Sequence, residues 1–517
     1  MFKRLRRKVK QRKTVTSDTG PPTNRQHYAA KAHERIRLRA LYDAAQTTDE
    51  NSNHWANADN LSADAAADPG IRQTVRNRAR YEVANNTYAR GLLLTLANDV
   101  IGTGPKLQMR LDETDSNRSI ERAFNERQAP AIRFAEKLRT LRVAKGQDGE
   151  GFGLYVHNPG LNAPVPLDIR PLEADYFTNP EPSIDDDNSA DGIFFDEYGN
   201  ELTYRVLRSH PGDLSGVGFG NEYDDVPAAY VAHWFRADRP GQHRGLPDIM
   251  PALPLFAMLR RFTLAVIAAA ETAADFAAVI QAKNSPVDEA GPGIEAMDPV
   301  ELERRMATVL PEGYEIGQIR AEQPATTYAE FKREILTEIA RCLSVPYNID
   351  ACDSSSYNYA SGRLDHQTYW KSIDVERDEV TRAIVEPYFS LWLRLYLSDR
   401  SGIAPEDIDL GLYPHTWHWP GREHVDPDKE AKAQDKKLKN KSSNYQLEYG
   451  RQGLDYETEL RQCNTEDQLK DRLALERIAA RKEAIADLGL TPEDLAPSPP
   501  PKEEPNGNPR EKAEAAA

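Results

Sequence analysis

The chain has 517 residues, a net charge of −16 and 39% hydrophobic residues, so it is long enough for about three domains and has the composition of a soluble globular protein. Its three cysteines are scattered, which excludes a disulfide framework or a cysteine-rich zinc site and favours synthesis in a reducing cytosol. No Gly-Lys pair occurs, so the phosphate-binding loop of an ATPase is excluded as well.

Residues 1–45 form a basic and then polar N-terminal arm. The first thirteen, MFKRLRRKVKQRK, contain eight Lys or Arg and no acidic residue, which leaves −24 for the rest of a chain whose total is −16. Tight binding of nucleic acid requires a basic surface that neutralises phosphates. The negative charge of the rest of the chain therefore predicts that it does not bind nucleic acid tightly. The arm alone favours a different protein, a nucleic-acid-binding, capsid-associated protein that acts through these residues.

The next part of the chain changes from a helical period to a strand period. Apolar residues at helical spacing predict one helix over about 71–102, which ends at glycines, and a second over about 117–144 with Pro130 near its middle. Alternating patterns then predict four strands: FGLYVH, PLDIRPL, GIFFDEYG and ELTYRVLRSH. Residues 70–240 are therefore predicted to form an α+β body.

A long alanine-rich helix is predicted over Pro247–Ile280. Glu271 and Asp275 lie four residues apart on one of its faces, and two acids inside the apolar stretch make membrane insertion costly. We therefore predict a packed helix and no membrane span. The segment that follows is acidic and interrupted by Pro and Gly. Its acids are Asp288, Glu289, Glu295, Asp298, Glu301, Glu303, Glu312 and Glu315.

A second helix, TYAEFKREILTEIARCL, is predicted to begin with a capping box of Thr327 and Glu330 and to end at Val345-Pro346. The uncharged polar stretch SSSYNYASGR after it predicts a loop. Its candidate contact residues are Ser354, Ser355, Ser356, Tyr357, Asn358, Tyr359, Ser361 and Arg363. A helix over about 363–398 with a kink at Pro387, a short strand at HTWHW, a charged helical segment over 426–488 and a disordered tail are predicted to follow.

Two patterns suggest metal sites. The stretch from Asp187 to Gly192 resembles the start of a calcium loop, but Tyr198 occupies the twelfth position where a bidentate glutamate is needed. A solvated acidic turn is the favoured interpretation. Three histidines beside a glutamate suggest zinc ligands, although half-buried histidines on a strand are favoured. They are His415, His418 and His424, with Glu423.

Three further patterns suggest an enzyme. The glycine-rich GQDGEGFG leads into a strand and not a helix, which favours a turn over a dinucleotide site. Ser354–Ser356 lack the strained turn of a serine nucleophile, although a hydrolase remains an alternative. Glu271 and Asp275 have no partner motif for acid–base catalysis, so an acidic stripe that faces water or a channel is favoured. The residues predict a protein that is not an enzyme and has no metal or cofactor.

Six blocks in order carry a resemblance to a known family. They are RARYEVANNTYARGLLLTLANDVIGTGP, LRTLRVAKGQDGEGFG, GIFFDEYGNELTYRVLRSHPGD, HWFRADRPGQHRGLPDIMPAL, LPEGYEIGQIRAEQPATTYAEF and LSVPYNIDACDSSSYNYASGR. Together they cover about residues 70–370, and the sequence resembles the portal proteins of tailed double-stranded DNA phages, the lambda-like family. The resemblance implies an α+β multidomain portal fold that assembles into a ring of twelve subunits at one capsid vertex.

The resemblance also implies a division into parts. These are an α+β wing at 46–245, a stem helix at 246–280, a small α/β clip at 281–325, a second stem helix at 326–344, a tunnel loop at 345–365, a kinked helix and wing return at 366–425, a helical crown at 426–490 and a tail at 491–517. SSSYNYASGR then lines the channel, with Glu271 and Asp275 as channel acids. Terminase is expected to dock on the clip acids Asp288, Glu289, Glu295, Asp298, Glu301 and Glu303.

The implied partners are those of a particle component. They are further copies of the chain, the terminase large subunit, which is a separate ATPase, the major capsid and scaffold proteins, head-completion or adaptor proteins, and double-stranded DNA passing through. The expected location is the virion, with the host cytoplasm during assembly. An acidic channel agrees with passage of DNA, because each added phosphate contact would hold the duplex back.

Overall fold

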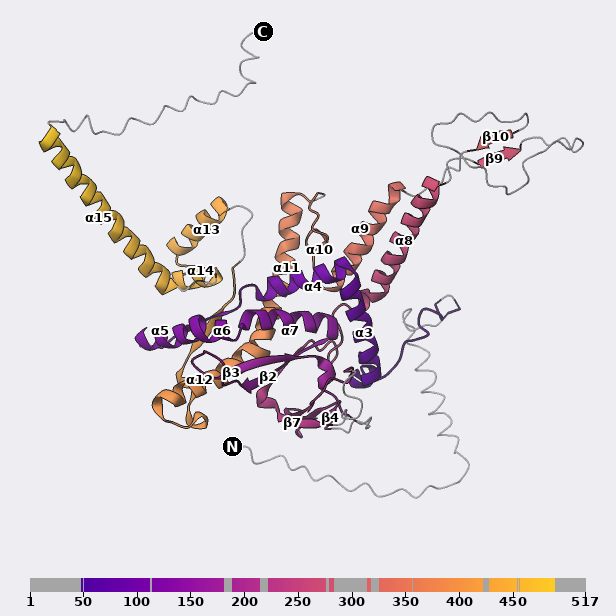
Figure 1. Ribbon diagram of the computed structural model, residues 1–517, viewed down its shortest axis with the longest axis horizontal. Helices are drawn as coiled ribbons and strands as arrows, with labels where there is room; N and C mark the ends of the chain where they lie inside the picture. Colours follow the sequence, from indigo (N-terminus) through magenta and orange to yellow (C-terminus); the bar gives the residue numbers. More distant parts are fainter. Residues whose placement is uncertain are drawn as a thin grey trace, which may run out of the picture. The chain divides into compact units, whose positions relative to one another are not determined.

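The computed structural model (Figure 1) describes most of the chain between residues 48 and 488. The described ranges are 48–49, 51–111, 114–180, 188–213, 222–275, 279–282, 314–317, 325–355, 357–421, 427–452, 454 and 456–488. The chain divides into two units, Met1–Ser62 and Ala63–Ala517. In the first unit the described residues include turns. In one of them the Ser52 N–H donates a hydrogen bond to the Thr48 carbonyl (2.9 Å). All elements below belong to the second unit.

The N-terminal helices of this unit are α2 (Ala63–Ala66), α3 (Pro69–Asn85) and α4 (Thr87–Ile101). The prediction of one continuous helix over 71–102 is wrong, because the chain breaks at Asn86. Asn86 is extended, and its side chain accepts hydrogen bonds from the backbone of Tyr88 and Ala89. Asparagine satisfies free N–H groups at a helix start better than it supports a helix interior. It therefore ends α3 and begins α4.

The helix predicted over 117–144 is also divided. Its parts are α5 (Thr114–Arg122), the π-helical turn η2 (Ala123–Gln128), α6 (Ala129–Ala131) and α7 (Phe134–Asp148). Pro130 has no N–H to donate inside a helix, and three residues later Arg133 adopts a left-handed conformation (φ 53°) that ends the turn. The helical segment is therefore interrupted after Pro130, between α6 and α7, and is not a single bent helix.

Two antiparallel sheets follow α7 and confirm the four predicted strands. The first has the order β3-β2-β8, with β2 (Glu150–His157), β3 (Leu167–Leu172) and β8 (Val231–Phe235). The second has the order β4-β5-β6-β7, with β4 (Ser189–Ala190), β5 (Ile193–Phe195), β6 (Glu201–Leu207) and β7 (Tyr223–Pro227). Short 3-10 helices lie at Ala174–Tyr176 and Ala228–Tyr230.

Strand β2 belongs to two cores because side chains alternate between the faces of a strand. Tyr155 joins a core of helical residues, which includes Leu138 of α7. Phe152, on the opposite face, stacks on Phe177 with ring centroids 3.9 Å apart and joins Tyr204 of β6 in a second core. The three-stranded sheet is therefore covered by α7 on one face and by residues of the four-stranded sheet on the other.

After β8 the chain forms η6 (Met250–Ala252), α8 (Leu253–Asp275), β9 (Val279–Ala282), β10 (Tyr314–Gly317) and α9 (Ala325–Cys342). The helix predicted over Pro247–Ile280 begins later, and residues 279–280 belong to β9, which pairs antiparallel with β10. The capping box at Thr327 is wrong, because α9 begins at Ala325. Helices α8 and α9 pack through Phe262 and Tyr328, whose rings stack at 5.7 Å.

One described segment, Met250–Glu271, is long and apolar enough to cross a membrane, and 17% of its most apolar window is buried. Length and composition alone define such a segment, so a single one is weak evidence of a membrane span. Its large exposed side chains are Met258, Leu264 and Ile267. The predicted packing of this helix is therefore only partial within the single chain.

The C-terminal part begins with α10 (Tyr347–Asp350) and α11 (Tyr359–Val380), which the π-helical turn η7 (Thr381–Val385) joins to α12 (Glu386–Ser401). The turn ends two residues before Pro387, so the helical hydrogen bonding changes beside the proline where a kink was predicted. Two 3-10 turns, Pro405–Asp407 and Leu410–Leu412, lead to β11 (His415–His418), the predicted strand, which pairs with β1 (Lys106–Met109). The helices of the charged segment are α13 (Pro427–Lys439), α14 (Tyr445–Arg451) and α15 (Tyr456–Leu488).

Candidate functional site

The stretch SSSYNYASGR is divided between a loop and a helix. Ser354 and Ser355 lie exposed in the loop, and the Asp353 carboxylate accepts a hydrogen bond from the Ser355 N–H (2.9 Å). Asn358 is the N-cap of α11, and together with Ser361 it forms a capping box. Within the tunnel loop that the resemblance implied over 345–365, residues 347–350 and 359–365 are helical. The helix predicted from about 363 begins four residues earlier, at Tyr359.

The other predicted contact residues have varied surroundings. Tyr357 is half-buried in the loop and its N–H donates to the Ser354 carbonyl (3.1 Å), whereas Ser356 and the side chain of Tyr359 lie outside the described residues. Arg363 is exposed on α11, and no ion pair of the described residues involves it. Cys352, Ser354 and Ser355 are exposed in the loop, whereas Asn358 and Arg363 are exposed at the start of α11.

The predicted acidic sites are described only in part. Glu271 is exposed near the end of α8, and Asp275 is the last residue of that helix, with a side chain outside the described residues. The clip acids Asp288, Glu289, Glu295, Asp298, Glu301 and Glu303 all lie outside the described residues. Of the excursion between α8 and α9, the paired strands β9 and β10 are described.

A buried group of eight charges, which we call the eight-charge cluster, joins α3 to both sheets. It contains four arginines and four carboxylates: Arg72, Arg76, Arg80, Arg244, Asp148, Glu150, Asp175 and Asp191. Arg72, Arg76 and Arg80 share one face of α3 because they are spaced by four residues. These eight side chains carry four positive and four negative charges, and Arg80 also reaches the more exposed Glu173 (3.3 Å).

Glu150 lies at the centre of the eight-charge cluster and has no exposed surface. Arg244 donates two hydrogen bonds to its carboxylate (2.7 and 2.8 Å), and the Gly245 N–H donates a third (2.7 Å). Burial alone would raise the pKa of Glu150, but Arg244 and then the neighbouring His233 and Arg72 hold this pKa well below its usual value. Glu150 is therefore negatively charged at neutral pH.

Two backbone segments, at Gly149 and at Gly245, cross very close to one another beside Glu150. Gly149 caps α7 with a left-handed conformation (φ 91°), so that β2 starts at the next residue. Its carbonyl oxygen would lie 2.1 Å from a Cβ atom placed on Gly245. Glycine is required at both positions, because the left-handed turn and the close crossing leave no room for a side chain. The crossing brings Arg244 to Glu150.

A second buried group, which we call the junction cluster, consists of Arg142, Lys145, Asp248 and Glu376. Glu376 of α11 accepts hydrogen bonds from Arg142 and Lys145 of α7, both at 2.9 Å. Asp248, which precedes α8, lies 3.3 Å from Arg142 and 3.6 Å from Lys145. The Asp248 carbonyl also accepts a hydrogen bond from the Cys342 thiol at the end of α9 (3.3 Å). The cluster ties α8, α9 and α11 to α7.

Acid is expected to weaken the junction cluster. Burial alone would raise the pKa of Glu376, but the charges of Arg142 and Lys145 lower it to about 2. A pKa below the usual value of 4.5 means that the stabilisation is complete above about pH 4.5 and is lost as the pH falls toward 2. Hydrogen exchange of α11, corrected for the intrinsic rate, should therefore accelerate below pH 4.5.

The Glu376→Gln variant provides the comparison. It should exchange faster than the parent at pH 6 and depend less on pH between 4.5 and 3, because the titrating group is absent. The matched control is Asp378→Asn, since Asp378 lies on the same helix in an exposed pair with Arg382. An unchanged pH profile in Glu376→Gln, or the same change in Asp378→Asn, contradicts the prediction.

The structure separates His415 and His418, two residues of the zinc alternative. His415 binds Glu386 through Nε2 (3.1 Å), whereas His418 binds Gln108 through Nε2 (2.7 Å). They are three residues apart on β11 and therefore point to opposite faces of the strand. His424 and Glu423 lie outside the described residues. The strand interpretation of these two histidines is confirmed.

The calcium interpretation is not supported at the residues that are described. Asp191 belongs to the eight-charge cluster, where its carboxylate pairs with Arg72 and Arg244. Within the described ranges a different group has metal-ligand geometry: ligand atoms of Glu173, Asp175 and His210 lie within 4.8 Å of one another. Arg80 already pairs with Glu173 (3.3 Å) and Asp175 (2.7 Å). A guanidinium therefore occupies the place where a metal cation would neutralise these acids.

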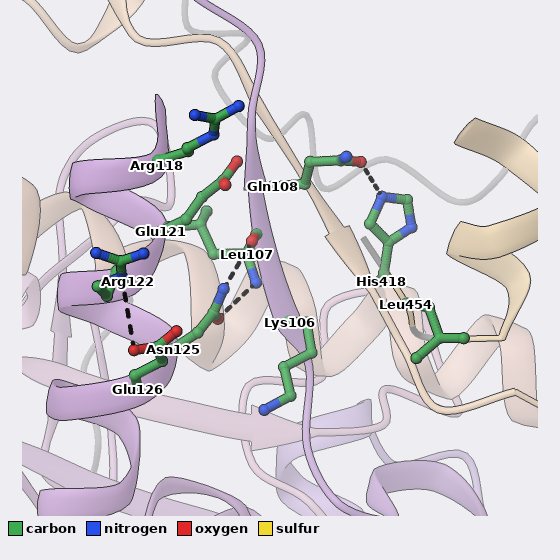
Figure 2. A pocket seen from close by; sticks show the side chains of 10 residues that line it. All are labelled: Lys106, Leu107, Gln108, Arg118, Glu121, Arg122, Asn125, Glu126, His418 and Leu454. Atoms are coloured by element: carbon green, nitrogen blue, oxygen red, sulfur yellow. Dashed lines mark hydrogen bonds and ion pairs between the residues drawn. The ribbon is translucent and has the colours of Figure 1, made fainter. Parts of the chain in front are cut away.

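A cavity of about 260 Å³ lies between β1, α5 and η2 (Figure 2). Lys106, Arg118, His418 and Leu454 are among its lining residues. The Asn125 side chain exchanges two hydrogen bonds of 2.9 Å with the Leu107 backbone, and Glu121 accepts from the Met109 N–H (2.7 Å). These polar groups hold β1 against the helix, and they are already paired within the chain.

Sequence reasoning missed both charged clusters. A signal was present, because arginines at 72, 76 and 80 repeat every four residues, but such a stripe is usually a solvated helix face. Arg244 and Glu150 are 94 residues apart in the chain, and no spacing connects them. Only the crossing of Gly149 and Gly245 brings them together.

Comparison with known proteins adds a family to this architecture. The family described as phage portal protein, lambda family, matches residues 49–377. A probable portal protein of Halomonas phage phiHAP-1 is 25% identical over 388 residues, which are 70% of this chain and 73% of that protein. The family match alone covers more than half of the chain.

Solved structures similar to the chain have TM-scores below 0.5. The neck of a native gene transfer agent particle, computed with C12 symmetry, has a TM-score of 0.42 at 14% identity, with 73% of this chain and 91% of that chain covered. A HK97 family phage portal protein from Corynebacterium diphtheriae has a TM-score of 0.26 at 14% identity, with 71% and 97% covered.

The family match places the chain among phage portal proteins, a structural and non-enzymatic class of virion component. Within that class, the chain belongs to the lambda family of phage portal proteins. The resemblance in the six sequence blocks is thereby confirmed. The mixed helix and sheet architecture agrees with the predicted α+β class.

Proposed function

We propose that twelve copies of this chain form a ring at one capsid vertex, and that DNA passes through the channel of the ring during packaging and ejection. The observation that carries this proposal is membership of the portal family over residues 49–377. In this proposal the chain acts without chemistry of its own. It nucleates assembly of the capsid with scaffold and major capsid proteins, first in the host cytoplasm and then as part of the virion.

The helices α8 and α9 form the stem of the proposed ring. Large apolar side chains of α8, namely Met258 (61% exposed) and Leu264 (60%), are uncovered in the single chain. Their burial against a neighbouring copy stabilises association, at about 25 cal/mol for each Å² removed from water. This contribution is needed, because twelve copies carry a charge of about −190, which opposes assembly.

The loop before α11 faces the DNA in this proposal. Ser354 and Ser355 present hydroxyl groups, which can make weak contacts with phosphates regardless of sequence. Glu271 and Asp275 repel the DNA backbone and keep the duplex centred, since each phosphate contact would add to a hold on the DNA. Arg363 is exposed beyond the loop and is available for one phosphate contact.

The clip acids Asp288, Glu289, Glu295, Asp298, Glu301 and Glu303 form the docking site for the terminase large subunit and later for head-completion or adaptor proteins. Support comes from their position in the excursion between α8 and α9 and from the density of negative charge. Such a surface attracts a basic partner at a rate that falls with salt. The residues 426–490 form the crown, and 46–245 with 366–425 form the wing.

Electron microscopy of the purified full chain, with mass from light scattering, tests the proposal. The expected result is a ring with a central hole. A chain that stays monomeric at every salt and protein concentration contradicts it. Deletion of residues 1–13 separates the proposal from the alternative, a nucleic-acid-binding protein that acts through its basic arm. That alternative requires the deletion to abolish function in a protein that forms no ring.

Changes in the loop are expected to affect DNA but not the ring. The variant with Tyr357 and Tyr359 changed to alanine and Asn358 changed to serine should retain severalfold less DNA per particle, because two aromatic rings and one amide are removed from the proposed DNA contact. Serine is chosen at 358 because it caps a helix about as well as asparagine. The measurement is the amount of protected DNA in assembled particles.

The control for these loop changes is Asn358→Ala, which removes the capping box of α11. It costs about 1 kcal/mol of helix stability and leaves both tyrosines in place. Loss of the ring in the triple variant would show that the loop is structural. Normal DNA retention in that variant would show that the loop does not contact DNA.

A further inference from the structure

Asp350 is a buried carboxyl group without a partner. It is the last residue of α10, directly before the loop, and it is 8% exposed. Neither of its carboxyl oxygens has a hydrogen-bond partner in the part of the chain that the structure describes. A buried carboxylate that is neither paired nor hydrogen-bonded is costly, because it loses hydration and receives nothing in return.

Ionisable groups on α10, on its packing partners α4 and α9, and in the following segment have other contacts. Examples are Arg333 and Lys332 on α9, Tyr88 on α4, Tyr347 on α10 itself, Asp353 in the loop and His366 on α11. Arg333 lies over the ring of Tyr347 (5.1 Å), and Lys332 lies over the ring of Tyr88 (5.2 Å). His366 contacts the side chain of Asn348 (3.1 Å). None of these contacts involves the Asp350 carboxyl group, which has no hydrogen-bond partner among the described residues.

The surroundings therefore favour the neutral acid. Burial, without any opposing charge, raises the pKa of Asp350 from its ordinary value of 3.8 to about 7. Below about pH 7, the packing of α10 therefore favours the protonated form. When the group ionises, it gains hydration only if it leaves this position.

Movement of Asp350 also affects the backbone, because its N–H group helps to close a helical turn. Helix α10 is a single turn of four residues, closed by hydrogen bonds from the Asp350 and Ala351 N–H groups to the carbonyls of Pro346 (3.1 Å) and Tyr347 (2.8 Å). The next residue, Cys352, is already left-handed (φ 52°), a conformation that costs free energy in a residue other than glycine. Exposure of the carboxyl group opens this turn and releases the strained residue beside it.

We propose that Asp350 is a protonation switch for the segment 347–355, which is docked with the neutral acid and released with the carboxylate. The local switch stands on the geometry of one chain. If the chain is a portal, the position of the loop in the channel changes as Asp350 loses or gains a proton. This consequence for DNA rests on the proposed portal function. The release of the serine-rich loop therefore depends on pH. A cationic group that paired with Asp350 would also change it, because the pair would stabilise the carboxylate.

Hydrogen exchange of the full chain, followed by mass spectrometry between pH 5 and 8, tests the switch. The carboxyl group binds its proton more tightly in the docked state, so the docked state loses stability as the pH rises from about 4 to 7 and changes little above 7. Exchange in peptides covering 347–355, corrected for the intrinsic rate, should increase about tenfold per pH unit up to pH 6.5 and then level off. Peptides from α7 and β2 serve as the internal reference.

Asp350→Asn, a neutral residue of the same shape, should abolish this pH dependence and keep the segment protected at pH 8. The matched control is Asp353→Asn, which removes a carboxylate three residues away and should leave the dependence in place. A pH-independent parent chain, or an unchanged dependence in Asp350→Asn, overturns the switch. The parent titration needs no variant, so it decides the question even if Asp350→Asn folds poorly.

The test is independent of the ring. Rings seen by electron microscopy together with pH-independent exchange would overturn the switch and leave the portal function intact. A pH-dependent segment in a chain that never forms rings would support the switch and contradict the portal function.

Discussion

Replacing Glu150 by glutamine is expected to destabilise the body of the protein by about 3 to 5 kcal/mol, because it leaves buried arginines without their central counter-charge. The eight-charge cluster contains four arginines and four carboxylates, so one lost carboxylate leaves one uncompensated positive charge. Glutamine also cannot accept the paired hydrogen bonds of Arg244 (2.7 and 2.8 Å) with the strength of a carboxylate. The loss is larger than that of an exposed pair because water cannot replace the missing partner.

Urea unfolding of the full chain, with hydrogen exchange of β2 as a regional readout, measures this loss. The matched control is Asp224→Asn. Asp224 also pairs with an arginine, Arg208 (2.7 Å), but both side chains are more than half exposed. Water and salt screen that pair, so the control should unfold like the parent. If Glu150→Gln also unfolds like the parent, Glu150 is not the anion that the cluster depends on.

Alanine at Gly245 is expected to destabilise the chain by about 3 kcal/mol or more and to lower the yield of folded protein. Its Cβ atom would lie 2.1 Å from the Gly149 carbonyl oxygen and 2.8 Å from Cγ of Glu150. The first contact is with backbone, which has no rotamer with which to avoid it. The two segments must separate, and Arg244 is then drawn away from Glu150.

Gly91→Ala is the matched control for Gly245→Ala. Gly91 lies inside α4 with no atom within 4 Å of a new Cβ. Alanine there should stabilise the chain by up to about 1 kcal/mol, because glycine is a poor helix former. The urea midpoints of the two variants should therefore move in opposite directions. A Gly245→Ala variant as stable as the parent would show that the crossing can widen without cost.

The local pattern of the chain predicted most elements correctly but not their boundaries. The alternating strands after α7, the strand at HTWHW and the interruption before Pro387 were all visible, because each depends on residues close in sequence. The break at Asn86 was missed although asparagine is a capping residue. Apolar residues on both sides keep a helical spacing, and this spacing does not reveal a change of direction.

The candidate site was predictable in its chemistry but only partly in its shape. The serine-rich stretch after α9 does contain an exposed loop, yet half of it begins α11 through the capping box of Asn358 and Ser361. That box was present in the sequence as residues three apart. It was missed because Ser, Asn and Gly are equally typical of loops. The isolation of Asp350 could not be seen, since it depends on which side chains surround α10.

By itself, the sequence determined the α+β class, the acidic body, the helices on both sides of the excursion and the membership of the portal family, because composition, periodicity and local motifs encode these properties. Only the tertiary structure decided that Arg244 meets Glu150 and that Glu376 meets Arg142 and Lys145. It also decided that Asp350 is buried without a partner. The reason is physical: burial and pairing depend on residues that are distant in the chain, and folding alone sets both the distance between charges and their access to water.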